Sequence, residues 1–123
     1  MPPVVQLPAR RDLVIRPGAE QVLRFVFEGT DGPFAFGGYG ARAMIRKRVA
    51  DPLVALALTL GSGIALGATD GSVTLTFTAA QCTALAPLFA GVWDLFLDPA
   101  GTPDATSFCA LRGNVTIDLP VTR

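Results

Sequence analysis

The chain has 123 residues, which is the size of one domain with a real core and too short for two. Half of it is hydrophobic and only 16% is charged, with ten basic and ten acidic residues, so no net field steers it toward nucleic acid or an anionic membrane. It has no histidine, which removes the usual general base and the usual metal ligand.

Residues 1–11 contain three prolines and end in Ala9-Arg10-Arg11. Proline cannot donate to a central β-ladder, so we predict an extended N-terminal arm that precedes a single domain over residues 12–123. Two interpretations of the arm stay open, a loose terminus or a segment that docks on a neighbour. The start lacks the charged and apolar regions of a secretory signal, and the longest apolar run, Leu53–Leu58, is too short to span a bilayer.

The first half of the chain alternates between apolar and polar residues in three places, which predicts strands over 12–16, 21–28 and 41–49. Turn residues at Pro17-Gly18 and over 29–33 separate them. The glycine-rich segment that follows carries three aromatic residues, Phe34, Phe36 and Tyr39. A strand and not a helix comes next, so we interpret these aromatics as packing or partner contacts and not as part of a phosphate loop.

The segment 53–60 is apolar on both faces and predicts a strand covered on both sides, by the core and by a second surface. A short strand around residues 64–66 and a clearly alternating strand over 72–78 follow. Thr78 and Gln81 have the spacing of a capping box, which predicts a short helix over 79–85.

The strand predicted over 91–98 carries the only tryptophan, Trp93. An indole buries about 200 Å², so we expect Trp93 to anchor the core. A last strand is predicted over 106–119, and its apolar residues stand at odd positions on either side of Gly113, which would permit a bend or a close approach.

Short, evenly spaced strands with turns between them predict an all-β fold. We expect an antiparallel β-sandwich of the immunoglobulin-like type, with about seven to eight strands and one short helix. A closed barrel is the alternative.

The chemistry of the sequence gives little support for an enzyme, and we predict none, with no catalytic residue, no metal site and no cofactor. Asp94 and Asp98 would share a strand face, but four positions separate them by about 13 Å, too far for paired acid–base work. The loop from Asp98 to Asp104 offers oxygens, so a calcium ion there is left open. Arg46-Lys47-Arg48 is interpreted as a solvated strand end and not as a nucleic-acid patch. The two cysteines, Cys82 and Cys109, fit reduced thiols better than a disulfide.

The order of these elements resembles a family of small bacteriophage and prophage proteins of the tail and baseplate, and is similar in layout to the N-terminal domain of baseplate upper proteins. The matching pieces, over about residues 12–123, are Asp12-Leu13-Val14-Ile15-Arg16-Pro17-Gly18, Gly40-Ala41-Arg42-Ala43-Met44-Ile45-Arg46, Gly71-Ser72-Val73-Thr74-Leu75, Gly91-Val92-Trp93-Asp94-Leu95, Leu111-Arg112-Gly113-Asn114-Val115-Thr116-Ile117 and Val121-Thr122-Arg123.

This resemblance implies a structural subunit of the virion, made in the host cytoplasm, in a tail tip, a baseplate or a fibre attachment. A capsid-surface, neck or head-decoration protein, or a non-viral adhesion module, is the alternative. The implied partners are other virion proteins and copies of the same chain, with no nucleic acid, membrane or small-molecule substrate. We expect the arm and the aromatic loop to make these contacts, through Arg10, Arg11, Phe34, Phe36 and Tyr39.

Overall fold

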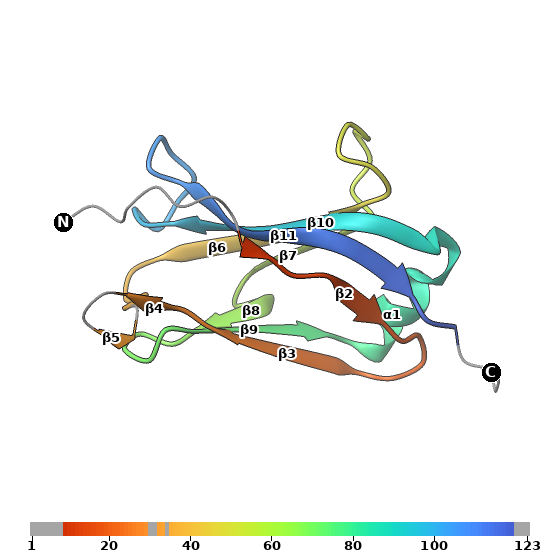
Figure 1. The fold of residues 1–123 in the computed structure, drawn as a ribbon, viewed down its shortest axis with the longest axis horizontal. Helices are drawn as coiled ribbons and strands as arrows, with labels where there is room; N and C mark the ends of the chain where they lie inside the picture. Colours follow the sequence, from red (N-terminus) through yellow and green to blue (C-terminus); the bar gives the residue numbers. More distant parts are fainter. Residues whose placement is uncertain (1–8, 30–31, 34, 120–123) are drawn as a thin grey trace.

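The computed structural model describes residues 9–29, 32–33 and 35–119 (Figure 1). No helix in these ranges is long and apolar enough to cross a membrane. The elements are β1 (Ala9–Arg10), β2 (Leu13–Ile15), β3 (Gln21–Val26), β4 (Glu28–Gly29), β5 (Gly32–Pro33), β6 (Gly40–Arg46), β7 (Leu56–Leu60), β8 (Gly63–Leu66), β9 (Ser72–Phe77), α1 (Ala79–Ala84), a 3₁₀ turn (Ala86–Leu88), β10 (Ala90–Asp98) and β11 (Phe108–Ile117).

Nine of these strands form one curled sheet in the order β1-β11-β10-β6-β7-β8-β9-β3, with β2 also paired to β11. The sheet folds over on itself, so that β11, β10, β6 and β7 lie above β8, β9 and β3 (Figure 1). The mostly-β fold with one short helix is therefore confirmed. In the described chain the two ends of this sheet are not paired with each other, so it does not close into a barrel.

The sheet is mixed, which corrects the prediction of a purely antiparallel one. β1 and β2 both run parallel to β11, and β7 runs parallel to β8. The β7–β8 pair comes from a tight turn in which Gly61 and Gly63 have φ angles of +82° and +102°. Such angles suit glycine, so the sequence can turn here and pass from the upper layer to the lower one.

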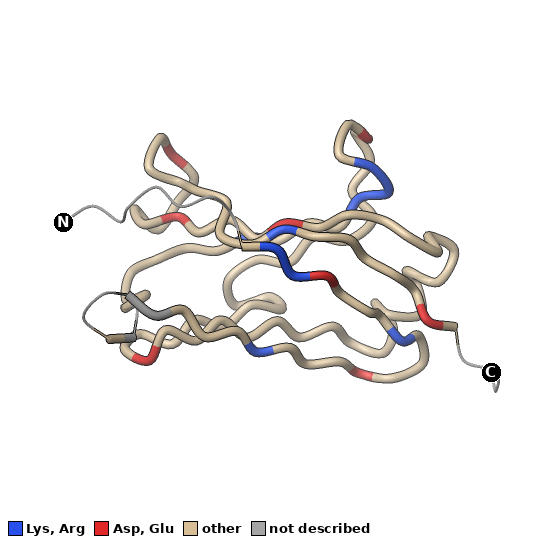
Figure 2. The backbone as a smooth tube through the Cα atoms, in the orientation of Figure 1, with Lys and Arg blue, Asp and Glu red and all other residues tan. Residues whose placement is uncertain are grey.

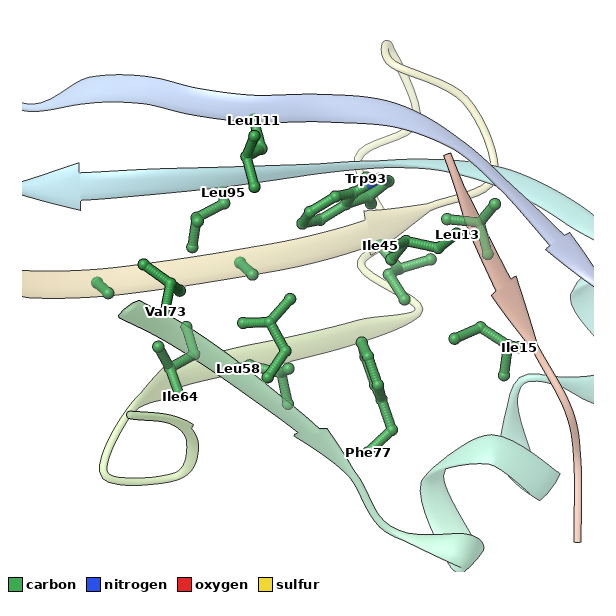
Figure 3. Packing of buried hydrophobic residues seen from close by; sticks show 14 of the residues in the cluster. Leu13, Ile15, Ile45, Leu58, Ile64, Val73, Phe77, Trp93, Leu95 and Leu111 are labelled. Carbon is green, nitrogen blue, oxygen red and sulfur yellow. The ribbon is translucent and has the colours of Figure 1, made fainter. Parts of the chain in front are cut away.

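The core lies between the two layers (Figure 3). The alternation predicted for β9 and β10 is confirmed. Val73, Leu75 and Phe77 of β9 are buried in the core, and so are Leu95 and Leu97 of β10 in the other layer. Each such side chain contributes about 1.5–3 kcal/mol through burial, so the two central strands supply much of the hydrophobic stabilisation.

Trp93 contacts both layers of the sheet and also the backbone of Arg11. It is 3% exposed, and its ring stacks on Phe25 of β3 with 6.1 Å between the ring centroids. Its indole Nε1 donates a hydrogen bond of 2.7 Å to the carbonyl oxygen of Arg11. Gly113 makes room for this contact, because a Cβ there would lie 2.1 Å from the same oxygen. The close approach predicted at Gly113 is therefore present.

The last three residues of the predicted arm belong to the sheet. Ala9 and Arg10 pair with Leu111 and Arg112, and the Arg11 amide donates to the Arg112 carbonyl at 2.9 Å. Residues 1–8 of the arm lie outside the described residues. The described sheet therefore includes Ala9 and Arg10, which the sequence had assigned to the arm.

The predicted helix is confirmed together with its capping box, since Thr78 and Gln81 exchange side-chain and backbone hydrogen bonds. β11 differs from its prediction at one point. A bulge between the pairs Leu95–Leu111 and Phe96–Cys109 adds an extra residue, so Ala110 is buried and Cys109 is only half-buried. The regular odd-position face is interrupted there because a bulge shifts which side chains point inward.

Replacing Trp93 by alanine should lower the free energy of unfolding by about 3–5 kcal/mol, because a large cavity remains between the layers. Trp93→Phe should cost less, about 1–3 kcal/mol, because it keeps most of the packing but leaves the Arg11 carbonyl without its donor. Urea denaturation measures both. Leu53→Ala, at a side chain 76% exposed, is the control and should unfold like the wild type. Equal losses for the phenylalanine and alanine variants would contradict the assigned hydrogen bond.

Two truncations test the start of the domain. Removing residues 1–8 should leave the melting temperature within about 2 °C of wild type, because no described strand is lost. Removing residues 1–11 should lower it by about 5 °C or more, because β1 and the acceptor of the Trp93 indole are lost together. Differential scanning calorimetry compares the three proteins. Identical melting of the two truncated chains would show that β1 adds nothing to stability.

Candidate functional site, the outer face of β6, β10 and β11

A groove of about 540 Å³ lies on the outer face of the upper layer, the face turned away from the core. Two loops rise from this layer, residues 47–55 (yellow) and 99–107 (blue), and they stand on the same side of it (Figure 1). The groove is lined by Arg10, Arg42, Met44, Arg46, Val49, Val92, Trp93, Asp94, Phe96, Arg112, Gly113 and Asn114.

The alternation of the three strands explains why these side chains meet. On β10, Trp93 points to the core, so its neighbours Val92 and Asp94 point outward. Strand register then places Asp94 between Met44 of β6 and Arg112 of β11. The floor of the groove is therefore partly apolar and partly cationic.

Asp94 is the single carboxylate in the lining of the groove. Burial raises its pKa above the usual range for aspartate, although Arg46, Arg42 and Arg112 each favour the charged form. Among the described residues it makes no ion pair within 4.0 Å. The loss of water around this carboxylate therefore outweighs the attraction of the surrounding guanidinium groups.

Arg42 connects the groove to the loop 99–107. Its Nη2 and Nε lie 3.3 and 3.4 Å from the carboxylate oxygens of Asp98, which is 2% exposed, and the Ser107 hydroxyl donates to Asp98 at 2.6 Å. The guanidinium also lies 4.9 Å from the centre of the Phe96 ring, in a cation–π contact. A buried carboxylate with these partners fixes both the arginine and the base of the loop.

Arg46 connects the groove to the other loop. Its Nη1 donates to the backbone oxygen of Asp51 at 2.6 Å, which holds the segment 47–55 against the end of β6. Lys47 and Arg48 are exposed, in keeping with the predicted solvated strand end, and Figure 2 shows these basic residues in the loop.

The loop 47–55 exposes large apolar side chains beside the groove. Val49, Leu53 and Val54 of this loop are 84%, 76% and 39% exposed, and Leu60 at the end of β7 is 46% exposed. The strand predicted over 53–60 begins only at Leu56. The second surface that was expected to cover its outer face is not present in the described chain, where most side chains of β7 are exposed. Clustered apolar side chains that remain in water are typical of surfaces that bind another protein.

The carboxylates of the loop 99–107 are used by the loop itself. Asp98 bonds to Arg42 and Ser107, and Asp104 accepts from the Thr106 hydroxyl and amide, which lowers the pKa of Asp104. No group of three His, Cys, Asp or Glu that could hold a metal ion occurs among the described residues. Both carboxylates are therefore held by hydrogen bonds from residues of this loop and of β6.

The two cysteines are free thiols in the structure, Cys82 in α1 and Cys109 at the start of β11. Burial raises the pKa of both, and for Cys109 the charge of Asp94 adds to the effect. A raised pKa keeps both side chains in the protonated thiol form at neutral pH.

The five residues predicted to contact partners do not come together. Arg10 lines the groove and pairs with Asp12 at 3.4 Å, and Arg11 contributes its backbone to the core. Phe34 lies outside the described residues. Phe36 is 2% exposed and packs against Phe27 and the half-buried Tyr39, with ring centroids 5.8 and 5.4 Å apart. The burial of Phe36 leaves it no surface for a partner, and it belongs to the core.

Sequence reasoning missed most of the groove. The sequence does contain the residues of its floor, on the outward faces of two predicted strands. The strand over 41–49 carries three basic residues and a methionine on that face, and the strand over 91–98 carries Val92, Asp94 and Phe96. Each face looks like an ordinary solvated surface by itself. Only the register of β6, β10 and β11 shows that they combine.

Comparisons with known proteins give little beyond the fold. No protein-family model and no curated protein matches the sequence. One solved structure that is similar is that of the extracellular domain of the voltage-gated sodium channel beta4 subunit, which forms parallel homodimers and has a role in cell–cell adhesion. The identity is 10% and the TM-score is 0.43, with 96% of this chain and 98% of that chain covered. At that distance the likeness assigns neither a family nor a function.

Asp94→Asn should stabilise the protein at neutral pH. The pKa of Asp94 is higher in the folded state than in the unfolded state, so ionisation of Asp94 lowers the stability of the folded protein. This loss of stability is absent below the pKa of the unfolded state and is complete once the pH has risen through the pKa of the folded state. The melting temperature should rise by about 2 °C at pH 7, and this gain should vanish below about pH 4. Thermal melts across that range measure it. A gain that persists in acid would contradict the assigned cause.

Proposed function

We propose that this chain is a non-enzymatic structural subunit of a bacteriophage virion, in the tail tip, baseplate or a fibre attachment, and that it binds other virion proteins through the outer face of β6, β10 and β11. The resemblance to bacteriophage tail and baseplate proteins is the basis for proposing a virion protein. The observation that carries the binding role is the loop 47–55, which holds Val49 and Leu53 in solvent at 84% and 76% exposure beside a cationic groove. A subunit that is permanently assembled would cover these side chains.

The finer fold assignment, an immunoglobulin-like sandwich, is part of this proposal. The order β3-β9-β8 in one layer and β11-β10-β6-β7 in the other corresponds to strands B-E-D and G-F-C-C′ of such domains. Two features differ from antibody domains. The tryptophan is on the equivalent of strand F and not C, and both cysteines are free thiols. A sandwich of this kind provides a stiff sheet whose outer face is available for partners.

The composition of the groove indicates the kind of partner. Arg10, Arg42, Arg46 and Arg112 line it together with apolar side chains, and arginine and methionine are enriched where proteins meet. Asp12 and Asp98 already pair with two of the arginines, so the remaining cationic character is modest. The favoured partner is a protein surface with an apolar centre and a few acidic groups at its rim.

The proposal assigns no catalytic activity, because the chain has no histidine and Asp94 is the single carboxylate that lines the groove. Its direct test is to produce particles from the phage or prophage genome that encodes the chain, purify them, and compare incorporation of the wild type with Val49→Asp/Leu53→Asp. The double variant should be incorporated at least about tenfold less, because two desolvated charges would enter the interface. Its melting temperature should match the wild type, since both side chains are exposed.

Ala65→Asp, at an exposed position on β8 in the other layer, is the matched control and should be incorporated normally. Full incorporation of the double variant would overturn the outer face as the contact. Recovery in purified heads and not in tails would favour a capsid-surface, neck or decoration protein. Absence from every particle fraction would overturn the virion role and leave an adhesion module as the remaining alternative.

A further inference from the structure

The charges in the groove on the outer face of β6, β10 and β11 do not balance. Four arginines line this groove, and Asp94 is its single carboxylate. Two of the four already lie beside an aspartate at the margin of the groove. The other two, Arg46 and Arg112, make no ion pair within 4.0 Å among the described residues. The groove therefore offers two guanidinium groups to a partner.

The two arginines without an ion pair are held in different ways. Arg46 is fixed, because its Nη1 donates to the backbone oxygen of Asp51 at 2.6 Å. Arg112 is exposed, and strand register sets it opposite Asp94 of β10 on one side and opposite Arg10 of β1 on the other. Like charges on directly opposite residues are unfavourable, so an anion close to Arg112 would be stabilising.

Asp94 stands where such an anion would enter. It is half-buried on the floor of the groove, and its carboxylate accepts no hydrogen bond from the described part of the chain. The charged and titratable groups around it are Arg42 and Arg46 of β6, Arg112 and Cys109 of β11 and, beyond β11, Arg10 of β1. An ionised Asp94 would repel a second carboxylate, whereas its protonated form can donate a hydrogen bond to one.

We propose that a side-chain carboxylate of the partner protein enters the groove between Arg46 and Arg112, and that Asp94 takes up a proton as this complex forms. The inference rests on the proposed function and adds the chemistry of the contact. Each arginine gives the incoming carboxylate a charge-assisted hydrogen bond, and protonated Asp94 donates another. The chain's own carboxylate is then covered by the partner in its neutral form, which avoids burying an unpaired ion.

Binding is then coupled to pH with a defined sign. Burial raises the pKa of Asp94 in the free chain, and a second anion nearby raises it further in the complex. The proton therefore strengthens binding fully below the pKa of the free chain, and this gain is lost as the pH rises through the pKa of the complex. The partner's carboxylate stays ionised above about pH 5, and the raised pKa of Cys109 keeps that thiol neutral.

A binding assay with the whole chain tests the inference. Head and tail sub-assemblies are prepared from a phage or prophage whose gene for the chain is deleted, and are titrated with purified chain from about pH 5.5 to about pH 8.5. The wild type should bind about tenfold more tightly at the acid end, which corresponds to one unit of pKa difference. Asp94→Asn should bind equally at both ends and more tightly than wild type at the alkaline end, because an amide is neutral and can donate.

Arg112→Gln should bind about tenfold more weakly at every pH, because a charge-assisted hydrogen bond is lost. Arg24→Gln, the same change at an exposed residue of β3 in the other layer, is the matched control and should bind like the wild type. Wild-type binding that is independent of pH, or unchanged in Arg112→Gln, would overturn the inference and leave the proposed function standing. A pH dependence that Asp94→Asn retains would remove Asp94 as its source and contradict the inference. No wild-type binding at any pH would overturn the proposed function and the inference together.

Discussion

The hydrogen bond from Trp93 to the Arg11 carbonyl is the constraint on which much of the structure depends. A buried indole needs an acceptor for its N–H, and here the acceptor is a backbone oxygen 82 residues earlier in the chain. It can approach only because Gly113 has no side chain in its path. This one contact positions β1 beside β11, while the ring of Trp93 stacks on Phe25 and holds the second layer. The edge of the sheet and its core are therefore fixed together.

The same strand that builds the core also builds the groove. On β10, Trp93 points inward and Asp94 points outward, so any shift in the register of β10 would disturb both at once. The position of Arg10 in the groove follows from β1, which the Arg11 carbonyl anchors to Trp93. A rigid core beneath a binding face reduces the cost of ordering that face when a partner binds.

Local signals predicted β9, β10 and α1, because alternation and the spacing of Thr78 and Gln81 are properties of neighbouring residues. The parallel pairings of β1 and β2, the bulge at Ala110 and the burial of Phe36 depend on contacts between distant segments. The order of apolar and polar residues within one strand does not indicate contacts between distant segments. The groove was missed for the same reason, since it exists only through the register of three strands. For Phe36 the sequence left packing and partner contact open, because its cover comes from Phe27 on another segment, which the pattern of its own loop does not indicate.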